Sequence, residues 1–259
     1  MSRSGYLLGL LLLFVATAAL ADELPFDLRG HAVQGGLLRG HAAPGVRVWI
    51  EGAPVKVAPD GAFLIGFARK APPRVKIEVA APGAPRVTHS FAVGQRNYKI
   101  QNIDGLPDSQ VNPGDAALKR ISRDSATIQA ARLRTSDTPL FSGAFQWPLV
   151  GTLTGIYGSQ RIFNGAPRSP HLGVDIAAPH STPIRAPADA VVVLVHEDMF
   201  FTGKTLILDH GHGLTSVYAH MSTITVKEGR SVAAGQVIAA VGQSGRATGP
   251  HLHWGVHLN

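Results

Sequence analysis

The chain ends in GPHLHWGVHLN, Gly249 to Asn259, a stretch that places three histidines within seven residues. His251 and His253 are two positions apart, so on an extended strand both side chains point to the same face. Such a pair is weak evidence by itself, because the chain contains 12 histidines. The pair therefore indicates either an ordinary strand that carries histidines or half of a metal site whose other half lies upstream.

The best upstream partner is SPHLGVDIAAP, Ser169 to Pro179, in which His171 and Asp175 are four positions apart. Gly173 and the bracketing prolines disfavour a helix, and an even spacing on an extended segment again places both side chains on one face. If this segment and the C-terminal stretch are neighbouring strands, four ligand-type side chains converge. A catalytic zinc takes three protein ligands and keeps one position open. One of the four would then be left for chemistry, as is typical of hydrolases.

The stretch TSVYAHM, Thr215 to Met221, adds a fifth group, His220. His220 follows Tyr218 by two positions, so we expect both side chains on the same face of a strand. A single histidine in a strand is more often a core residue than a catalyst, but here it joins a consistent set. A further H-x-H in DHGHG, Asp209 to Gly213, is interpreted as a turn.

The composition limits the kinds of site and partner. The chain has no cysteine, which excludes a disulfide framework and a thiolate zinc site, so a metal would have to use imidazole and carboxylate. The formal net charge is +7, but the basic residues are scattered and do not interleave with aromatics as in nucleic-acid grooves. We therefore expect no nucleic-acid partner. A polyanionic envelope or cell-wall surface explains the charge equally well.

The N-terminus has the form of a secretory signal peptide, residues 1–21. Arg3 precedes the apolar run YLLGLLLLFVATAALA, and Ala19 and Ala21 form an A-x-A cleavage site. The alternative is an uncleaved membrane anchor, but the run of ~16 residues is shorter than the roughly 20 needed to span a bilayer. We expect export to the periplasm or cell envelope, with no stable membrane span after the signal is removed.

Residues 22–100 have the pattern of a small antiparallel β-sandwich. Apolar side chains alternate along four short runs, at Val46–Ile50, Val55–Val57, Phe63–Phe67 and Val75–Val79. The APDG stretch at Ala58–Gly61 predicts a turn, since Pro59 sets its own φ and Asp-Gly supplies the left-handed position. His, Asp and Glu do not cluster in this region, so we interpret it as an accessory structural or docking domain.

Residues 101–144 are predicted to be a linker with one helix at about 115–134, where apolar residues recur at helical spacing. The apolar stripe is thin, so we expect the helix to pack on a neighbour. Residues 145–259 return to an all-β pattern, with short Val/Ile runs between glycines that supply positive φ. The expected fold is mostly β: a sandwich, a helical linker and a C-terminal Gly-rich β-sheet domain.

The segments HLGVDIAAP, SVYAHM and GPHLHWGV resemble, in order, the three signature segments of the lysostaphin-type (LytM-like) zinc endopeptidases of peptidoglycan. The resemblance covers about 145–259 and implies a peptidase domain with one Zn²⁺ per chain. The zinc ligands that it implies are His171, Asp175 and His253, and the catalytic histidines are His220 and His251. The lead-in YGSQRIFNGAPRSPH resembles the family's groove-lining segment, which implies Arg161 and Asn164 as candidate substrate contacts.

The resemblance leaves the division of labour between the two catalytic histidines open. In such a site one histidine takes a proton from the attacking water, and another stabilises the oxyanion that forms. We favour His251 as the base and His220 as the oxyanion stabiliser. The chain ends six residues after His253, where such domains normally continue. Two alternatives follow: the sequence is a fragment, or the domain finishes without its last strand.

The leading hypothesis for function is an exported zinc endopeptidase that cuts peptide cross-links of peptidoglycan during cell-wall remodelling. Direct D-Ala–diamino acid links and glycine bridges both stay open. The direct link is favoured because nothing resembles a domain for recognising glycine bridges. Residues 22–144 would dock the enzyme, with envelope proteins as partners, or cover its groove.

Two alternatives come from other classes of protein. A non-enzymatic envelope adaptor would use the same fold to activate a cell-wall amidase, but family members of that kind lack the zinc ligands that are all present here. A carrier or wall-binding domain would need no metal at all. It predicts no loss of function on His171→Ala, whereas a peptidase predicts near-complete loss.

Overall fold

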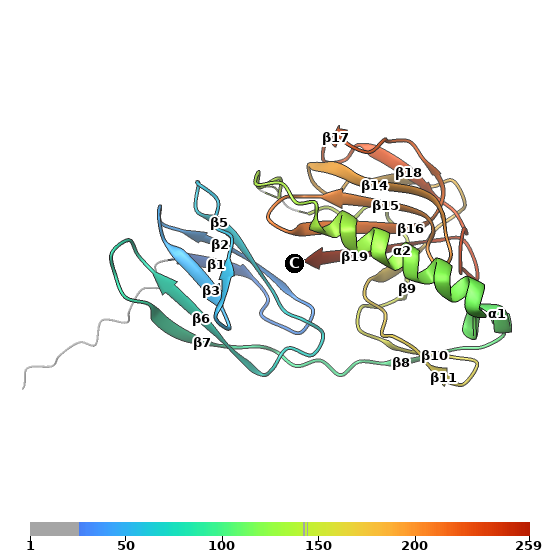
Figure 1. Cartoon of the computed structure of the whole chain (residues 1–259), viewed down its shortest axis with the longest axis horizontal. Coiled ribbons are helices and arrows are strands. Elements are labelled where there is room, and N and C mark those ends of the chain that lie inside the picture. The colour runs from blue at the N-terminus through green and yellow to red at the C-terminus, as the bar shows by residue number, and fades with distance from the viewer. Residues whose placement is uncertain (1–25, 142, 144) are drawn as a thin grey trace, which may run out of the picture.

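The structure, a computed structural model, describes residues 26–141, 143 and 145–259 (Figure 1). The expected signal peptide, residues 1–21, lies outside the described residues. Within the described part of the chain, no helix is both long and apolar enough to cross a membrane. The fold is mostly β, as the sequence predicted, with two β-rich lobes and one long helix lying across the C-terminal lobe.

The N-terminal lobe consists of two antiparallel sheets that share one core. The first sheet has the order β1 (Phe26–Gly30), β2 (Leu37–Ala42), β5 (Ala62–Gly66), and the second has the order β4 (Ala53–Val55), β3 (Arg47–Ile50), β6 (Arg74–Ala80), β7 (Val87–Ala92). Alternate side chains point inward, and Val48, Phe63 and Ile77 are buried in the core. The alternating runs therefore form the predicted sandwich, because period-two hydrophobicity places one face of each strand away from water.

The connection between the lobes takes part in the C-terminal structure. Residues 100–103, within the expected linker except for its first residue, form β8 (Ile100–Ile103). This strand pairs in parallel with β10 (Gln160–Phe163), which also pairs with β11 (Ala166–Pro167). Backbone hydrogen bonds thus join the segment before the helix to the segment before His171.

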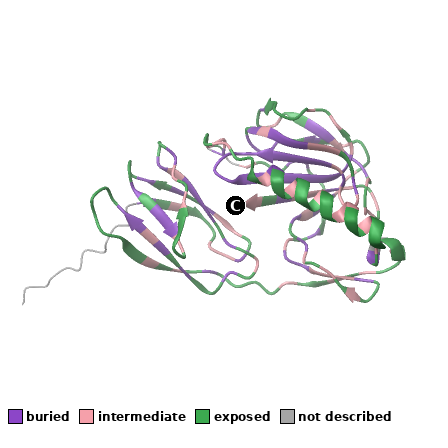
Figure 2. Cartoon of the chain, viewed as in Figure 1, coloured by how far each residue is buried: buried purple, intermediate pink, exposed green. Residues whose placement is uncertain are grey.

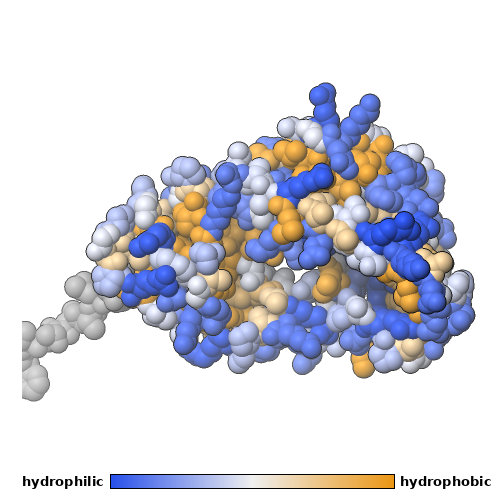
Figure 3. Space-filling model, viewed as in Figure 1, coloured by the Kyte–Doolittle hydropathy of each residue, from blue (hydrophilic) through white to orange (hydrophobic). Residues whose placement is uncertain are grey.

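The predicted helix is present as α2 (Asp115–Leu133), preceded by the short α1 (Asp108–Val111). Its inner face packs Ile128 and Ala131 against buried residues of the C-terminal sheet, including Val193. Most of its remaining surface is exposed and hydrophilic (Figures 2 and 3). This arrangement explains the thin apolar stripe, since only one narrow face of the helix contacts the sheet.

The C-terminal lobe is built on a nine-stranded sheet. Seven strands follow the order β17 (Ser231–Val232), β14 (Ala190–Met199), β15 (Gly203–Asp209), β16 (Leu214–Ile224), β19 (His251–Leu258), β12 (Val174–Ala177), β9 (Thr152–Gly155). The other two, β13 (Pro183–Arg185) and β18 (Val237–Val241), pair with each other, and β18 also pairs with β16. The stretch Thr215 to Met221, expected to form a strand, lies in β16.

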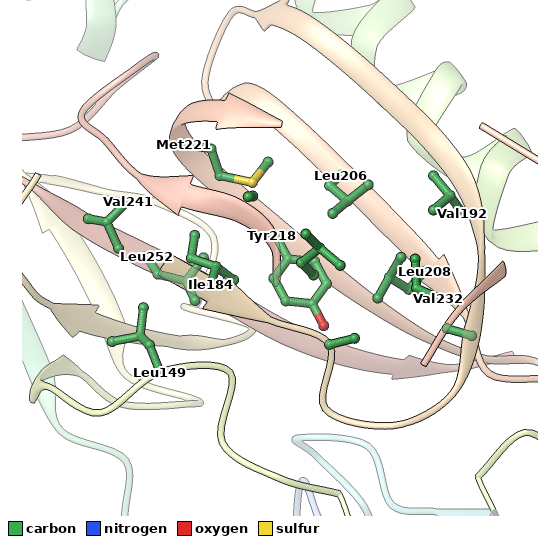
Figure 4. Packing of buried hydrophobic residues seen from close by; sticks show 14 of the residues in the cluster. Leu149, Ile184, Val192, Leu206, Leu208, Tyr218, Met221, Val232, Val241 and Leu252 are labelled. Carbon is green, nitrogen blue, oxygen red and sulfur yellow. The ribbon is translucent and has the colours of Figure 1, made fainter. Parts of the chain in front are cut away.

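A core of buried side chains fills the space between these strands (Figure 4). Tyr218, Leu206, Leu252 and Ile184 are all fully buried in it. Burying a side chain of this size contributes about 1.5–3 kcal/mol to folding. Leu252 matters most for the site, because its burial directs the flanking His251 and His253 to the opposite face of β19.

Candidate metal centre and active site

Strands β12 and β19 are antiparallel neighbours, so the two motifs at opposite ends of the domain meet side by side. In their register Asp175 lies opposite His253, and Ala177 lies opposite His251. Residues directly opposite each other point to the same face. The convergence of two extended segments, expected from the even spacing of their polar residues, is thus present in the sheet.

Three side-chain atoms meet at this place. His171 Nε2 lies 2.9 Å from His253 Nδ1 and 3.0 Å from Asp175 Oδ1, and His253 Nδ1 lies 2.9 Å from the same oxygen. Three atoms at such separations leave a point about 2.0–2.2 Å from each, which is the distance at which zinc binds nitrogen and oxygen. Two imidazoles and one carboxylate are also a ligand set typical of catalytic zinc. The residues present therefore fit a zinc ion.

His171 reaches this point from a loop, because β12 begins only at Val174. Its backbone N–H donates to Ser159 O at 2.9 Å, and its Nδ1 lies 3.3 Å from Ile156 O. A carbonyl oxygen can only accept, so Nδ1 carries the hydrogen and Nε2 presents its lone pair to the other two ligand atoms. The neighbouring Gly173 permits this packing, since a Cβ there would lie 2.8 Å from the His253 ring.

The carboxylate of Asp175 has a different partner on each oxygen. Oδ1 faces the two imidazoles, and Oδ2 lies 2.5 Å from Arg161 Nη2. Burial alone would raise the pKa of Asp175, but hydrogen bonds from His171 and His253, together with their charges, hold it well below its usual range. Arg161, a predicted substrate contact, thus orients a predicted ligand.

The two other predicted histidines lie beside this group. His220 Nδ1 is 2.8 Å from Ser244 O, and His251 Nδ1 is 2.8 Å from Gly249 O. Both Nδ1 atoms therefore carry hydrogens, which leaves each Nε2 as a proton acceptor. The ring centroids are 4.7 Å apart, and His251 Nε2 lies 4.0 Å from Asp175 Oδ1. Burial, and then the neighbouring His251, lower the pKa of His220 to about 3.

The expectation that Tyr218 and His220 share a strand face is wrong. Tyr218 belongs to the hydrophobic core, whereas His220 lines the groove described below. The register against β15 shifts between Lys204–Leu206 and Tyr218–Met221, and His220 has a φ of 64°. This bulge inserts an extra residue and breaks the period-two alternation, so His220 turns toward His251 instead of into the core.

A groove with a volume of about 320 Å³ opens over these residues. His220 and His251 line one part of it, and Asp175 and Arg161 line another. Asn164, the other predicted substrate contact, does not line it. Its side-chain amide instead donates to Leu106 O at 2.8 Å, and its Oδ1 accepts from Leu106 N at 3.3 Å.

Sequence reasoning missed some residues that line the groove. Gln101, Ile103 and Leu106 come from β8 and the loop that follows it, and they form a wall beside the histidines. Nothing local marks these residues, because they lie far from every motif in the sequence. Arg246, which also lines the groove, lies five positions before His251 and could have been found as the charged residue nearest to that motif.

Comparisons with known proteins find relatives of the C-terminal region. The sequence model of peptidase family M23 matches residues 169–259. The DD-carboxypeptidase/endopeptidase Mpg of Neisseria meningitidis is 42% identical over 89 residues, 34% of this chain and 20% of Mpg. The peptidoglycan DD-endopeptidase ShyA of Vibrio cholerae is 41% identical over 86 residues, 33% of this chain and 20% of ShyA. The chain thus spans about a fifth of the length of these curated relatives.

A solved structure extends the likeness to most of the molecule. A crystal structure from Pseudomonas aeruginosa assigned to peptidase M23 is 36% identical, with a TM-score of 0.66. The match covers 88% of this chain and 90% of that one. It therefore includes far more than the peptidase motifs. Together with the resemblance of its three signature segments, this likeness shows that the chain belongs to peptidase family M23.

Proposed function

We propose that this protein is a zinc endopeptidase that hydrolyses peptide cross-links of peptidoglycan. One observation carries the proposal: His171, Asp175 and His253 direct three ligand atoms to one point within 3.0 Å of each other. Two further imidazoles, each with an accepting Nε2, lie beside that point in an open groove. Metal ligands, a base and room for a chain-like substrate are the parts that peptide hydrolysis needs.

Each residue then has a distinct role. A zinc ion held by His171, Asp175 and His253 would supply Lewis acidity for activating a carbonyl and a water molecule. His251 accepts the proton of the attacking water through Nε2 and passes a proton to the leaving amine, because it is the free histidine that lies 4.0 Å from a ligand oxygen. His220 stabilises the oxyanion from the adjacent position. Arg161 holds Asp175 so that one oxygen faces the two histidine ligands.

The substrate and location follow from the relatives and from the chain's own features. Mpg and ShyA are named as a carboxypeptidase/endopeptidase and a peptidoglycan endopeptidase of the DD class. The apolar N-terminal run with its A-x-A site supports export to the periplasm, and the net charge of +7 suits a polyanionic wall. We propose the division of the chain into a signal (1–21), an accessory sandwich (22–100), a helical linker (101–144) and a peptidase domain (145–259).

The test combines metal analysis with digestion of purified peptidoglycan. We expect the protein to bind about one zinc per chain and to release soluble fragments in a reaction that EDTA stops. His253→Ala should lose both properties. His180→Ala is the matched control, because His180 is exposed and its Nδ1 lies 2.9 Å from Oγ of its neighbour Ser181. Unchanged zinc content and digestion in His253→Ala would refute the proposal. An unmodified protein that neither binds zinc nor digests peptidoglycan would favour an adaptor that activates an amidase.

A further inference from the structure

Guanidinium groups concentrate around the groove. Among the described residues that line it, Arg161 and Arg246 are basic, and Asp175 alone is acidic. The charge of Asp175 already faces Arg161. Burial, followed by the charges of Arg161 and Arg168, lowers the pKa of Arg246 to about 10, so this group keeps its charge at neutral pH. Two guanidinium groups along one groove favour an anionic ligand in it.

The Arg246 side chain is held in place by aromatic rings. Its Cζ lies 4.0 Å from the ring centroid of Phe201 and 4.7 Å from that of Phe163. Its backbone N–H donates to Phe201 O at 2.9 Å, which fixes the start of the side chain as well. Ring contacts use the faces of a planar guanidinium, whereas its N–H donors lie in the plane. The two rings thus limit the positions of a group that suits a planar anion such as a carboxylate.

Arg246 lies in the same part of the chain as His251, the proposed base. Residues 247–250 line the groove without a break between Arg246 and His251. A peptide whose scissile bond lies beside His251 would therefore extend along the same wall. The Arg246 side chain thus lines the same groove as His251.

We propose that Arg246 binds a substrate carboxylate next to the scissile bond, and that this contact selects direct cross-links over glycine bridges. In a direct cross-link to a diamino diacid, the carbon that bears the cross-linked amine also carries a carboxyl group, adjacent to the scissile amide. A glycine bridge has no ionisable group within its length. The inference rests on the proposed function, since it identifies which peptidoglycan peptides the same groove accepts.

The test uses defined cross-linked muropeptide dimers in matched forms. Among direct cross-links, one form carries free carboxyl groups, a second is amidated on the diamino acid, and a third is amidated at the C-terminal carboxyl. A glycine-bridged dimer is the remaining substrate. Fragment release is followed by mass spectrometry to obtain kcat/KM. We expect the unmodified protein to cleave the form amidated on the diamino acid roughly 10- to 100-fold more slowly, because a charge-assisted hydrogen bond is lost. Slower cleavage of only the form amidated at the C-terminal carboxyl would overturn the proposal.

Variants of Arg246 are tested on the same substrates. Arg246→Met should lose the same factor on the free-carboxyl form and no longer distinguish it from the amidated one, whereas Arg246→Lys should retain part of the preference. Arg86→Met is the matched control, since Arg86 stacks 3.8 Å from the Trp49 ring centroid in the other lobe. Zinc content should be unchanged in all three variants.

The outcomes separate this inference from the proposed function. Equal cleavage of all three forms by the unmodified protein would overturn the role of Arg246 and leave the endopeptidase intact. Cleavage of glycine bridges but not of direct cross-links would also overturn the role of Arg246 and leave the endopeptidase intact. Full discrimination by Arg246→Met would assign the preference to another group. Failure to cleave any peptidoglycan peptide would overturn the proposed function, and the inference with it. The substrate forms are compared on the unmodified protein, so a folding defect in an Arg246 variant cannot account for the result.

Discussion

Gly155 lies directly against the carboxylate of Asp175. The two residues are opposite each other in the β9–β12 pairing, and a Cβ built on Gly155 would lie 2.4 Å from Asp175 Oδ2 and 2.8 Å from its Cγ. A real side chain cannot occupy that space unless the carboxylate moves. The position of a predicted metal ligand thus depends on a missing side chain in the adjacent strand.

Gly155→Ala should weaken metal binding. The added methyl group displaces the carboxylate from its contacts with His171 and Arg161, and changes of this kind around a metal ligand cost about 10- to 100-fold in affinity. Chelator competition with zinc measures the effect directly. Gly114→Ala is the control, since a Cβ there meets nothing within 4 Å. An unchanged zinc affinity in Gly155→Ala would show that the strand pairing does not constrain the ligand.

Zinc should stabilise the folded protein, because its three ligands come together only in the folded chain. Ligand binding to the native state alone adds about 2.7 kcal/mol at a concentration of 100 Kd. We expect added zinc to raise the midpoint of thermal unfolding in the unmodified protein and to have little effect on His171→Ala. Scanning calorimetry with and without EDTA measures this difference. An equal zinc response in the variant would contradict the assigned ligand.

The wall formed by Gln101, Ile103 and Leu106 should affect substrate binding without affecting the metal. Asn164 secures this wall through two hydrogen bonds to the backbone of Leu106. Asn164→Ala removes both, so we expect kcat/KM for muropeptides to fall about 3- to 10-fold while zinc content stays the same. Asn102→Ala, an exposed position in β8, serves as the control. A loss of zinc in Asn164→Ala would instead indicate a wider collapse of the site.

Acid should destabilise the fold partly through His210, which is fully buried outside the metal centre. Its Nδ1 donates to Asp189 O at 2.9 Å and its Nε2 accepts from Ser216 Oγ at 2.8 Å. Burial lowers the pKa of His210, although Asp189 and Asp209 oppose the change. Below about pH 6.5 the unfolded chain then binds a proton that the folded chain does not, so stability falls as the pH decreases toward the folded pKa.

His210→Gln tests this contribution by urea unfolding at pH 7.5 and pH 5. The variant should be less stable at pH 7.5, because it loses a buried packing group, but it should lose less stability on acidification than the unmodified protein. Part of the acid loss should remain, since burial also lowers the pKa of His257. His180→Gln, at an exposed position, should leave the acid loss unchanged. An acid loss equal to that of the unmodified protein would remove His210 from the explanation.

Much of the fold follows from local patterns. The alternating runs of residues 46–79 predicted the strands of the sandwich, and the apolar spacing after Asp115 predicted α2 to within a residue or two. The sequence does not predict β8, because a four-residue edge strand with two of its residues exposed has no strong pattern. Its partner β10 lies 60 residues further along the chain, and neither segment has a sequence pattern that predicts this pairing.

By itself the sequence determined which side chains could hold a metal and which way they point along each strand. His251 and His253 face the same way, with Leu252 in the core, because period-two alternation is a property of the extended backbone. Only the tertiary structure decided that His220 turns into the groove, since a bulge at a left-handed residue overrides that alternation. It also decided that Arg246 and Ile103 line the same space. Contacts between distant segments depend on how whole strands pack, which no short stretch of sequence specifies.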